Sequence, residues 1–188
     1  MGLTPFVNEP MTDFNLPANR EKMEAAFKHV QAEVLGKDWP LVINGKAVET
    51  GRFIARNNPG NLKQLIGRVH IAERKHADEA LAAAITAFES WRKVSGAERA
   101  RYLLRAAAAL RRRKFEFMAL MSLEAGKNWP EADGDVAEAI DFLEFYARRM
   151  IEIDQPHPTT PFPGEENQVH WIPLGPVYAV PPWNFPLA

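Results

Sequence analysis

The sequence predicts an α/β protein, and three observations indicate this fold class. Residues 41–72 are rich in strand and turn signals, and the hydrophobic period changes to that of helices from residue 75 onward. The short apolar run Val177–Val180 is typical of a buried strand in a parallel sheet. A parallel strand needs neighbouring strands and a crossover helix, which the few residues after Val180 cannot supply. We therefore expect the chain to be a fragment that holds only the start of the sheet.

The first 40 residues are predicted to form an arm that ends in a helix. Prolines punctuate the stretch from Asn8 to Pro17, and an amphipathic helix is expected over residues 19–35, closed by Gly36. The apolar face of this helix is expected to hold Met23, Phe27, Val30 and Val34.

A small β unit is predicted next, over residues 41–72. Asn44 and Gly45 follow the strand residues 41–43 and tolerate the positive φ values of a type I′ hairpin turn. Residues 57–60 form a second turn cluster, and residues 65–71 alternate as a strand does.

Three helices are then expected to pack as one layer. The first spans residues 75–91, and the second is expected to run unbroken from residue 97 to Gly126, which is roughly eight turns. The third begins near Pro130, which suits a first helical turn because it has no N–H to leave unpaired. The inward face of the third helix is expected to hold Val136, Ile140, Leu143, Ala147 and Ile151.

The composition excludes several classes of function. The chain has 188 residues with 23 Lys and Arg against 24 Asp and Glu, a formal net charge of −1 that argues against nucleic-acid or anionic-membrane partners. We interpret the basic run Arg111–Lys114 as a solvated helix face. The absence of cysteine excludes disulfides and thiolate metal sites, and the five histidines lack metal-ligand spacing, so no metal is expected. Without a leader or a long apolar stretch, we expect a cytoplasmic protein.

The segment Pro181–Pro186 is the most unusual part of the sequence. It places Trp183, Asn184 and Phe185 at the carboxyl end of a predicted strand, which is where ligands bind in open α/β sheets. The uncharged amide of Asn184 offers two N–H donors and suits an oxyanion that forms during a reaction. The alternative is an asparagine that only forms a turn.

Residues Pro182–Pro186 resemble the signature of the NAD(P)-dependent aldehyde dehydrogenase superfamily. Other segments that agree with this superfamily are Leu41–Gly45, Asn58–Pro59, Ala87–Phe88 with Trp91, Arg99–Leu110, Glu124–Lys127 and Gly175. Residues 5–188 most resemble the N-terminal part of the 1-pyrroline-5-carboxylate dehydrogenase subgroup. The segments that carry this closer resemblance are Pro5–Phe6, Asn8–Pro10, Arg111–Lys114, Gly126–Trp129, Val136–Phe142 and Pro163–Glu165.

The resemblance implies the N-terminal part of the aldehyde dehydrogenase fold, in four regions. Residues 1–40 are the arm and its helix, and residues 41–154 are the β unit and helical layer of the NAD-binding domain. Residues 155–173 belong to the oligomerisation ribbon, and residues 174–188 form the first strand and turn of the NAD-binding sheet.

The resemblance also implies an activity, the NAD-dependent oxidation of L-glutamate γ-semialdehyde (1-pyrroline-5-carboxylate) to L-glutamate in proline degradation, with NADP as the alternative cofactor. The reaction passes through a cysteine thiohemiacetal whose oxyanion donor maps onto Asn184. Cofactor binding maps onto Val180, Pro182 and Trp183, mainly through backbone. Pro181 stands where the family usually has a small residue, and it has no N–H to donate. Without a nucleophile or a catalytic glutamate in matching context, the fragment itself is expected to be inactive.

Glu138 is the second candidate site residue, and on a helix it shares a face with Phe142 and Phe145. By resemblance this carboxylate lies in the aldehyde tunnel, where it suits the α-ammonium group of the substrate. Phe185 lines the same tunnel by the same resemblance. A solvated helix glutamate is the alternative interpretation of Glu138.

Two other functions stay open: an aldehyde dehydrogenase for another semialdehyde, such as succinate semialdehyde, and a free-standing helical interaction module without catalysis. For the enzyme we expect a small-molecule aldehyde substrate and a homo-oligomer, to which Thr159–Ile172 contributes by resemblance. Neither nucleic acid nor a membrane is an expected partner.

Overall fold

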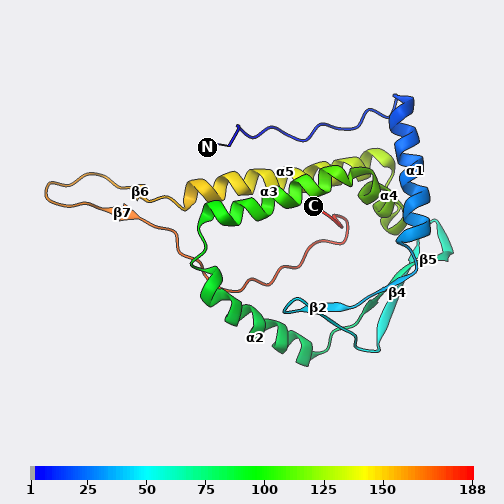
Figure 1. Ribbon diagram of the computed structural model, residues 1–188, viewed down its shortest axis with the longest axis horizontal. Coiled ribbons are helices and arrows are strands. Elements are labelled where there is room, and N and C mark those ends of the chain that lie inside the picture. The colour runs from blue at the N-terminus through cyan, green and yellow to red at the C-terminus, as the bar shows by residue number, and fades with distance from the viewer. Residues whose placement is uncertain (1–2) are drawn as a thin grey trace.

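The computed structural model describes residues 3–188 and combines a helical layer with small groups of strands (Figure 1). The helices are α1 (Pro17–Glu33), α2 (Arg74–Trp91), α3 (Gly96–Arg112), α4 (Lys114–Ala125) and α5 (Trp129–Ile153). The strands are β1 (Lys37–Trp39), β2 (Leu41–Ile43), β3 (Lys46–Val48), β4 (Phe53–Asn58), β5 (Asn61–His70), β6 (His157–Pro158) and β7 (Gln168–Val169). None of the helices in residues 3–188 is both long and apolar enough to cross a membrane.

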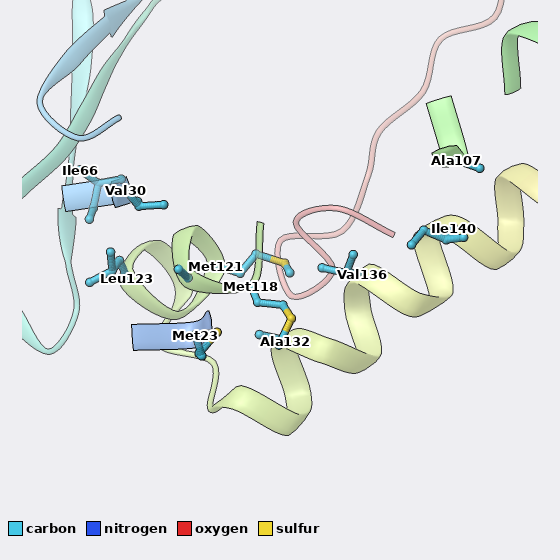
Figure 2. Packing of buried hydrophobic residues seen from close by; sticks show 11 residues of the cluster. Met23, Val30, Ile66, Ala107, Met118, Met121, Leu123, Ala132, Val136 and Ile140 are labelled. Atoms are coloured by element: carbon cyan, nitrogen blue, oxygen red, sulfur yellow. The ribbon is translucent and has the colours of Figure 1, made fainter. Parts of the chain in front are cut away.

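Helices α3 and α5 lie side by side, and α4 and α1 cover one end of this pair (Figure 1). The start of α3 is fixed to the end of α5, because Asp154 accepts a hydrogen bond from the Gly96 N–H at 2.6 Å. The main hydrophobic cluster joins α1, α4 and α5, with Met23, Met118 and Ile140 fully buried in it (Figure 2). The predicted apolar face of α1 is confirmed, since Met23 and Val30 are fully buried and Phe27 and Val34 pack against the cluster.

The long helix expected over residues 97–126 is two helices, which corrects the prediction. At Arg113 the backbone leaves helical geometry, with φ −107° and ψ 17°. The break redirects α4 so that α1, α5 and β4 all pack on it. Because α4 is apolar over most of its surface, contact on several sides buries more of it than a straight extension of α3 would. The buried residues of α4 are Met118, Ala119, Met121 and Leu123.

The strands form a three-stranded sheet and a separate hairpin. Strand β5 is central, with β1 parallel on one side and β4 antiparallel on the other. Strand β1 lies within the first 40 residues, where the sequence indicated no strand. The hairpin of β2 and β3 has the expected turn, with φ 50° at Asn44 and 72° at Gly45. Helix α2 packs mainly against β2, and so the expectation that it joins the helical layer is wrong.

The last part of the chain differs most from the prediction. The segment after α5 forms the short antiparallel pair β6 and β7, which projects beyond the helices (Figure 1). Residues 173–182 form no strand, and Val177 and Val180 are 86% and 74% exposed. No described strand lies alongside them, and a strand is stable only when a neighbour accepts and donates its backbone hydrogen bonds. The buried parallel strand expected at Val177–Val180 is therefore not formed here.

Candidate functional site

A cleft of about 810 Å³ lies along one face of α5 and brings together residues from both ends of the chain. Helix α5 forms its floor with Gly134, Glu138 and Phe142, because these positions recur at the helical period. The residues that line the cleft are Phe6, Asn8, Glu9, Met11, Lys127, Glu131, Gly134, Asp135, Ala137, Glu138, Asp141, Phe142, Phe145, Tyr146 and Phe185. Glu138 and Phe185, both predicted site residues, thus line one cleft.

Glu138 is exposed, and it is the one carboxylate lining the cleft whose side chain makes no hydrogen bond with any residue among 3–188. Glu131, the other exposed carboxylate of the lining, caps the start of α5 by accepting from the Asn128 N–H. Aromatic rings stand beside Glu138 on the same face. Phe142 and Tyr146 lie 6.0 Å apart between ring centroids, and Phe145 meets Phe6 edge to face at 5.5 Å. The cleft therefore combines an available negative charge with apolar walls.

An irregular stretch, residues 4–12, forms another wall of the cleft, and we call it the N-terminal strap. Asp133 of α5 accepts hydrogen bonds from the Thr12 N–H (2.5 Å) and hydroxyl (2.8 Å). Asp141 accepts from the Glu9 N–H and the Asn8 amide, each at 2.7 Å. Two carboxylates of α5, two turns apart, thus hold the strap against this helix.

Lys127 follows the end of α4 and contacts α5. Gly126 ends α4 in the left-handed region, at φ 72°, and turns the chain so that Lys127 points back to α5. The ammonium of Lys127 pairs with Asp135 at 2.6 Å and lies 5.2 Å from the centre of the Phe185 ring. Asp135 also accepts from the Ala188 N–H at 2.9 Å. This pair holds Phe185 at the edge of the cleft.

A second cleft of about 700 Å³ adjoins the first and contains Trp183 and Asn184. Lys127, Glu131 and Phe185 line both clefts, which places Asn184 one residue from the shared wall. The turn that carries Asn184 is closed by its backbone, where the Phe185 N–H donates to the Pro182 carbonyl at 3.3 Å. The amide of Asn184 is exposed and makes no hydrogen bond with any residue from 3 to 188. It is therefore free to donate to a ligand.

Of the three residues predicted for cofactor binding, Val180 lies on the exposed segment before this turn, and Pro182 and Trp183 form its first half. Trp183 is 89% exposed and lines the second cleft, and Val180 lines neither cleft. Pro181 and Pro182 have no N–H, so this stretch offers a ligand its carbonyls, apolar surface and an indole. Those groups fit the ribose and the rings of a dinucleotide, whereas the donors for its phosphates have to come from elsewhere.

The basic run Arg111–Lys114 is largely neutralised within the chain. Arg111 bridges Glu9 (2.6 Å) and Glu144 (2.7 Å), and Lys114 pairs with Asp133 at 2.8 Å. Burial acts to lower the pKa of Arg111, but its hydrogen bonds with the two glutamates raise the pKa above the ordinary value. Burial acts to raise the pKa of Glu144, yet hydrogen bonds from Arg148 and Arg111 hold it below the ordinary value. Arg111 and Glu144 therefore stay charged and paired across neutral pH.

The sequence prediction missed Asp133, Asp135 and Asp141. A signal was present, because the first two flank Ala132 and Val136 on the apolar side of the helix, where an unpaired charge is costly. Such a carboxylate implies a partner elsewhere in the chain, but the sequence does not say which segment supplies it.

Comparisons with known proteins identify relatives across the whole chain. The model of the aldehyde dehydrogenase family matches residues 46–188. The chain is 50% identical over 182 residues to 1-pyrroline-5-carboxylate dehydrogenase 2 of Bacillus subtilis, a match that covers 97% of this chain and 35% of that protein. A protein of the same name from Halalkalibacterium halodurans is 50% identical over 186 residues, covering 99% of this chain and 36% of its own length.

Solved structures give the same picture. The crystal structure of a 1-pyrroline-5-carboxylate dehydrogenase from Thermus with bound NAD matches with a TM-score of 0.94 and 41% identity, over 100% of this chain and 36% of that one. The corresponding enzyme from Mycobacterium tuberculosis matches with a TM-score of 0.79 and 27% identity, over 93% of this chain and 33% of that one. The chain thus spans about a third of the length of the proteins it resembles.

Proposed function

This chain belongs to the aldehyde dehydrogenase family, and from that premise we propose that it is the N-terminal part of an enzyme that oxidises L-glutamate γ-semialdehyde to L-glutamate with NAD. Relatives named 1-pyrroline-5-carboxylate dehydrogenase support this substrate, since they match 97–99% of the chain. The observation that carries the proposal is the pair of adjoining clefts, one with Glu138 and the other with Asn184, which share the wall at Phe185.

The larger cleft suits an amino-acid semialdehyde. The carboxylate of Glu138 is available to pair with the α-ammonium group, and Phe142 and Phe185 offer apolar surface to the methylene carbons between the two ends. The aldehyde carbon of a substrate held in this way lies toward Phe185, and hence toward the second cleft and Asn184.

Asn184 acts as the oxyanion donor in this proposal. When a cysteine thiolate adds to the aldehyde, the carbonyl oxygen gains a negative charge, and a fixed amide N–H stabilises that charge more than it stabilises the neutral aldehyde. The chain holds no cysteine, so the nucleophile comes from the part of the enzyme that this chain does not span. NAD supplies the hydride acceptor when bound, and Val180, Pro182 and Trp183 would hold it through carbonyls and apolar surface.

The homo-oligomer is proposed to use the projecting pair β6 and β7. Around these strands, the large apolar side chains of Phe162, Trp171 and Ile172 are exposed, which is typical of a surface that a partner covers. A second copy of the enzyme is the partner that the family resemblance implies.

The test uses a chimera in which this chain replaces the matching segment of the Bacillus subtilis relative. We expect Asn184→Ala to lower kcat by about 10²- to 10³-fold, as the loss of one oxyanion donor does, with little change in NAD affinity. Asn15→Ala is the matched control, since this exposed side chain makes no hydrogen bond within residues 3–188. An unchanged kcat for Asn184→Ala would contradict the oxyanion role.

Substrate choice is tested in the same chimera by Glu138→Gln. Loss of a charged partner is expected to raise KM for glutamate semialdehyde about 10- to 100-fold, with KM for succinate semialdehyde unchanged or lower. Equal turnover of the two aldehydes by the unaltered chimera would favour the alternative, an aldehyde dehydrogenase for another semialdehyde.

A further inference from the structure

We propose that the N-terminal strap, residues 4–12, is a specificity-determining wall of the aldehyde cleft, and that Asp141 and Asp133 are the positioning residues that hold it there. The inference rests on the proposed function for the chemistry of the ligand. It goes beyond that function because it assigns the selection among aldehydes to a segment remote from Asn184 and Glu138 in the sequence.

The strap is held at one end by a buried charge. Asp133 is only 1% exposed, and it binds both the backbone and the hydroxyl of Thr12. Lys114 neutralises Asp133 at 2.8 Å and donates to the Pro10 carbonyl at 3.0 Å. Three hydrogen bonds therefore fix residues 10–12 to the side chains of Lys114 in α4 and Asp133 in α5, which are 11% and 1% exposed and pair with each other.

The middle of the strap is fixed by Asp141 and Arg111. Asp141 accepts from Asn8 and from the Glu9 N–H, each at 2.7 Å, and Arg111 pairs with the Glu9 carboxylate at 2.6 Å. Nearer its start, the Thr4 carbonyl accepts from Arg148 at 2.9 Å. A backbone without helix or strand is thus pinned at successive points along its length.

The polar side chains of the strap that line the cleft are already paired within the chain, so the surface that the strap offers to a ligand is apolar. The Asn8 amide is committed to Asp141 and the Glu9 carboxylate to Arg111, whereas Phe6 and Met11 line the cleft without a polar partner. Met11 approaches α5 at Gly134, where a Cβ atom would lie 3.8 Å from the Met11 Cε. The strap therefore selects among aldehydes by how well their carbon chains fit its apolar surface. Glu138, on α5, selects by pairing with the α-ammonium group of the substrate.

The comparisons support a role in substrate choice. The model of the whole aldehyde dehydrogenase family matches residues 46–188 and does not reach the strap. The match with the relative from Halalkalibacterium halodurans spans 186 of the 188 residues and therefore includes nearly all of the strap. The strap thus lies outside the residues that the family model matches and within the match with a relative of this one name.

The experiment measures kcat/KM of the chimera with glutamate semialdehyde, propanal and hexanal. Asp141→Asn removes one strap contact, and Met11→Ala removes apolar surface from the wall. We expect each variant to lower the ratio of kcat/KM for glutamate semialdehyde to kcat/KM for propanal by about tenfold. We also expect Met11→Ala to raise the ratio of kcat/KM for hexanal to kcat/KM for propanal. Asp38→Asn is the matched control, because it removes one carboxylate from the exposed pair with Arg68, away from the cleft.

The outcomes separate the strap from the proposed function. An unaltered chimera that oxidises the simple aldehydes but not glutamate semialdehyde overturns the substrate assignment, and the strap is then judged on the hexanal-to-propanal ratio alone. Two results overturn the strap as a specificity wall. In the first, the kcat/KM ratios between aldehydes stay within about twofold of the unaltered chimera in both variants. In the second, kcat/KM falls equally with every aldehyde. Met11→Ala keeps the test valid if Asp141→Asn fails to fold, since Met11 is 58% exposed.

Discussion

The N-terminal strap and the C-terminal segment, residues 173–184, have similar backbones but different environments. Both contain prolines, and neither forms a helix or a strand. The strap is pinned to α5 by Asp133 and Asp141, while the large side chains of the C-terminal segment, such as Val177, are exposed. The difference teaches that an irregular segment is ordered here by carboxylates of the neighbouring helix, the buried Asp133 and the half-buried Asp141, and not by its own local preferences.

The chain after the C-terminal segment is held in the same way as the strap, by a carboxylate of α5 that accepts a backbone N–H. After Asn184, Phe185 packs under Lys127 and the Ala188 N–H donates to Asp135. Helix α5 thus holds both ends of the described chain with carboxylates that its apolar face buries. The candidate site lies between these anchored stretches, which is why residues far apart in the sequence share one cleft.

The largest expected effect comes from Asp133→Ala, which breaks the anchor of the strap. Lys114 would be left in a site where its side chain is 11% exposed, and loss of one partner of a buried pair costs about 3–5 kcal/mol. Urea unfolding of the chain measures this as a lower midpoint. Asp38→Ala, in the exposed pair with Arg68, is the control, with an expected cost of about 0–1 kcal/mol. Equal losses of stability for the two variants would contradict the view that the buried pair at the strap contributes more than an exposed surface pair.

A smaller effect is expected from Asp135→Ala, which tests the anchor at the other end. Lys127 is more exposed than Lys114 and can regain water, so the expected cost is about 1–3 kcal/mol. Hydrogen exchange provides the sharper measurement. The Ala188 amide should lose its protection, whereas the amides of Glu9 and Thr12, which donate to Asp141 and Asp133, should keep theirs. Loss of protection at both ends would mean that the two anchors are one cooperative unit.

The sequence predicted the elements that depend on local pattern. The buried face of α1 and the turn at Asn44–Gly45 follow from helical period and from the positive φ that these residues tolerate. The same holds for α5, whose expected inward residues Val136, Ile140 and Ala147 are fully buried.

The errors concern features that only the tertiary structure sets. No glycine or proline marks the break at Arg113, because it arises from the packing of α1, α5 and β4 around α4. The run Val177–Val180 has strand composition but no partner strand in the described chain. The place of Glu138 beside Phe142 on one helix face could be predicted from the helical period, and its proposed role in the site came from the family resemblance. The strap could not be predicted, since its contacts join residues more than 100 positions apart.

The smallest expected effect is a change in acid stability through Glu144, which pairs with Arg111 beneath the strap. Burial acts to raise the pKa of Glu144, but the hydrogen bonds from Arg148 and Arg111 lower it overall, so its folded pKa lies below its unfolded value. Its contribution to stability is therefore complete above the unfolded pKa of about 4.3 and is lost as the pH falls through the folded pKa. Glu144→Gln should destabilise the chain at pH 7, and the difference from the unaltered chain should shrink in urea unfolding below about pH 4. The control is Glu24→Gln, at an exposed carboxylate with no hydrogen bond within residues 3–188, which should leave the pH profile unchanged. A difference for Glu144→Gln that is the same at every pH would mean that shape and packing, rather than the charge of Glu144, hold this part of the strap in place.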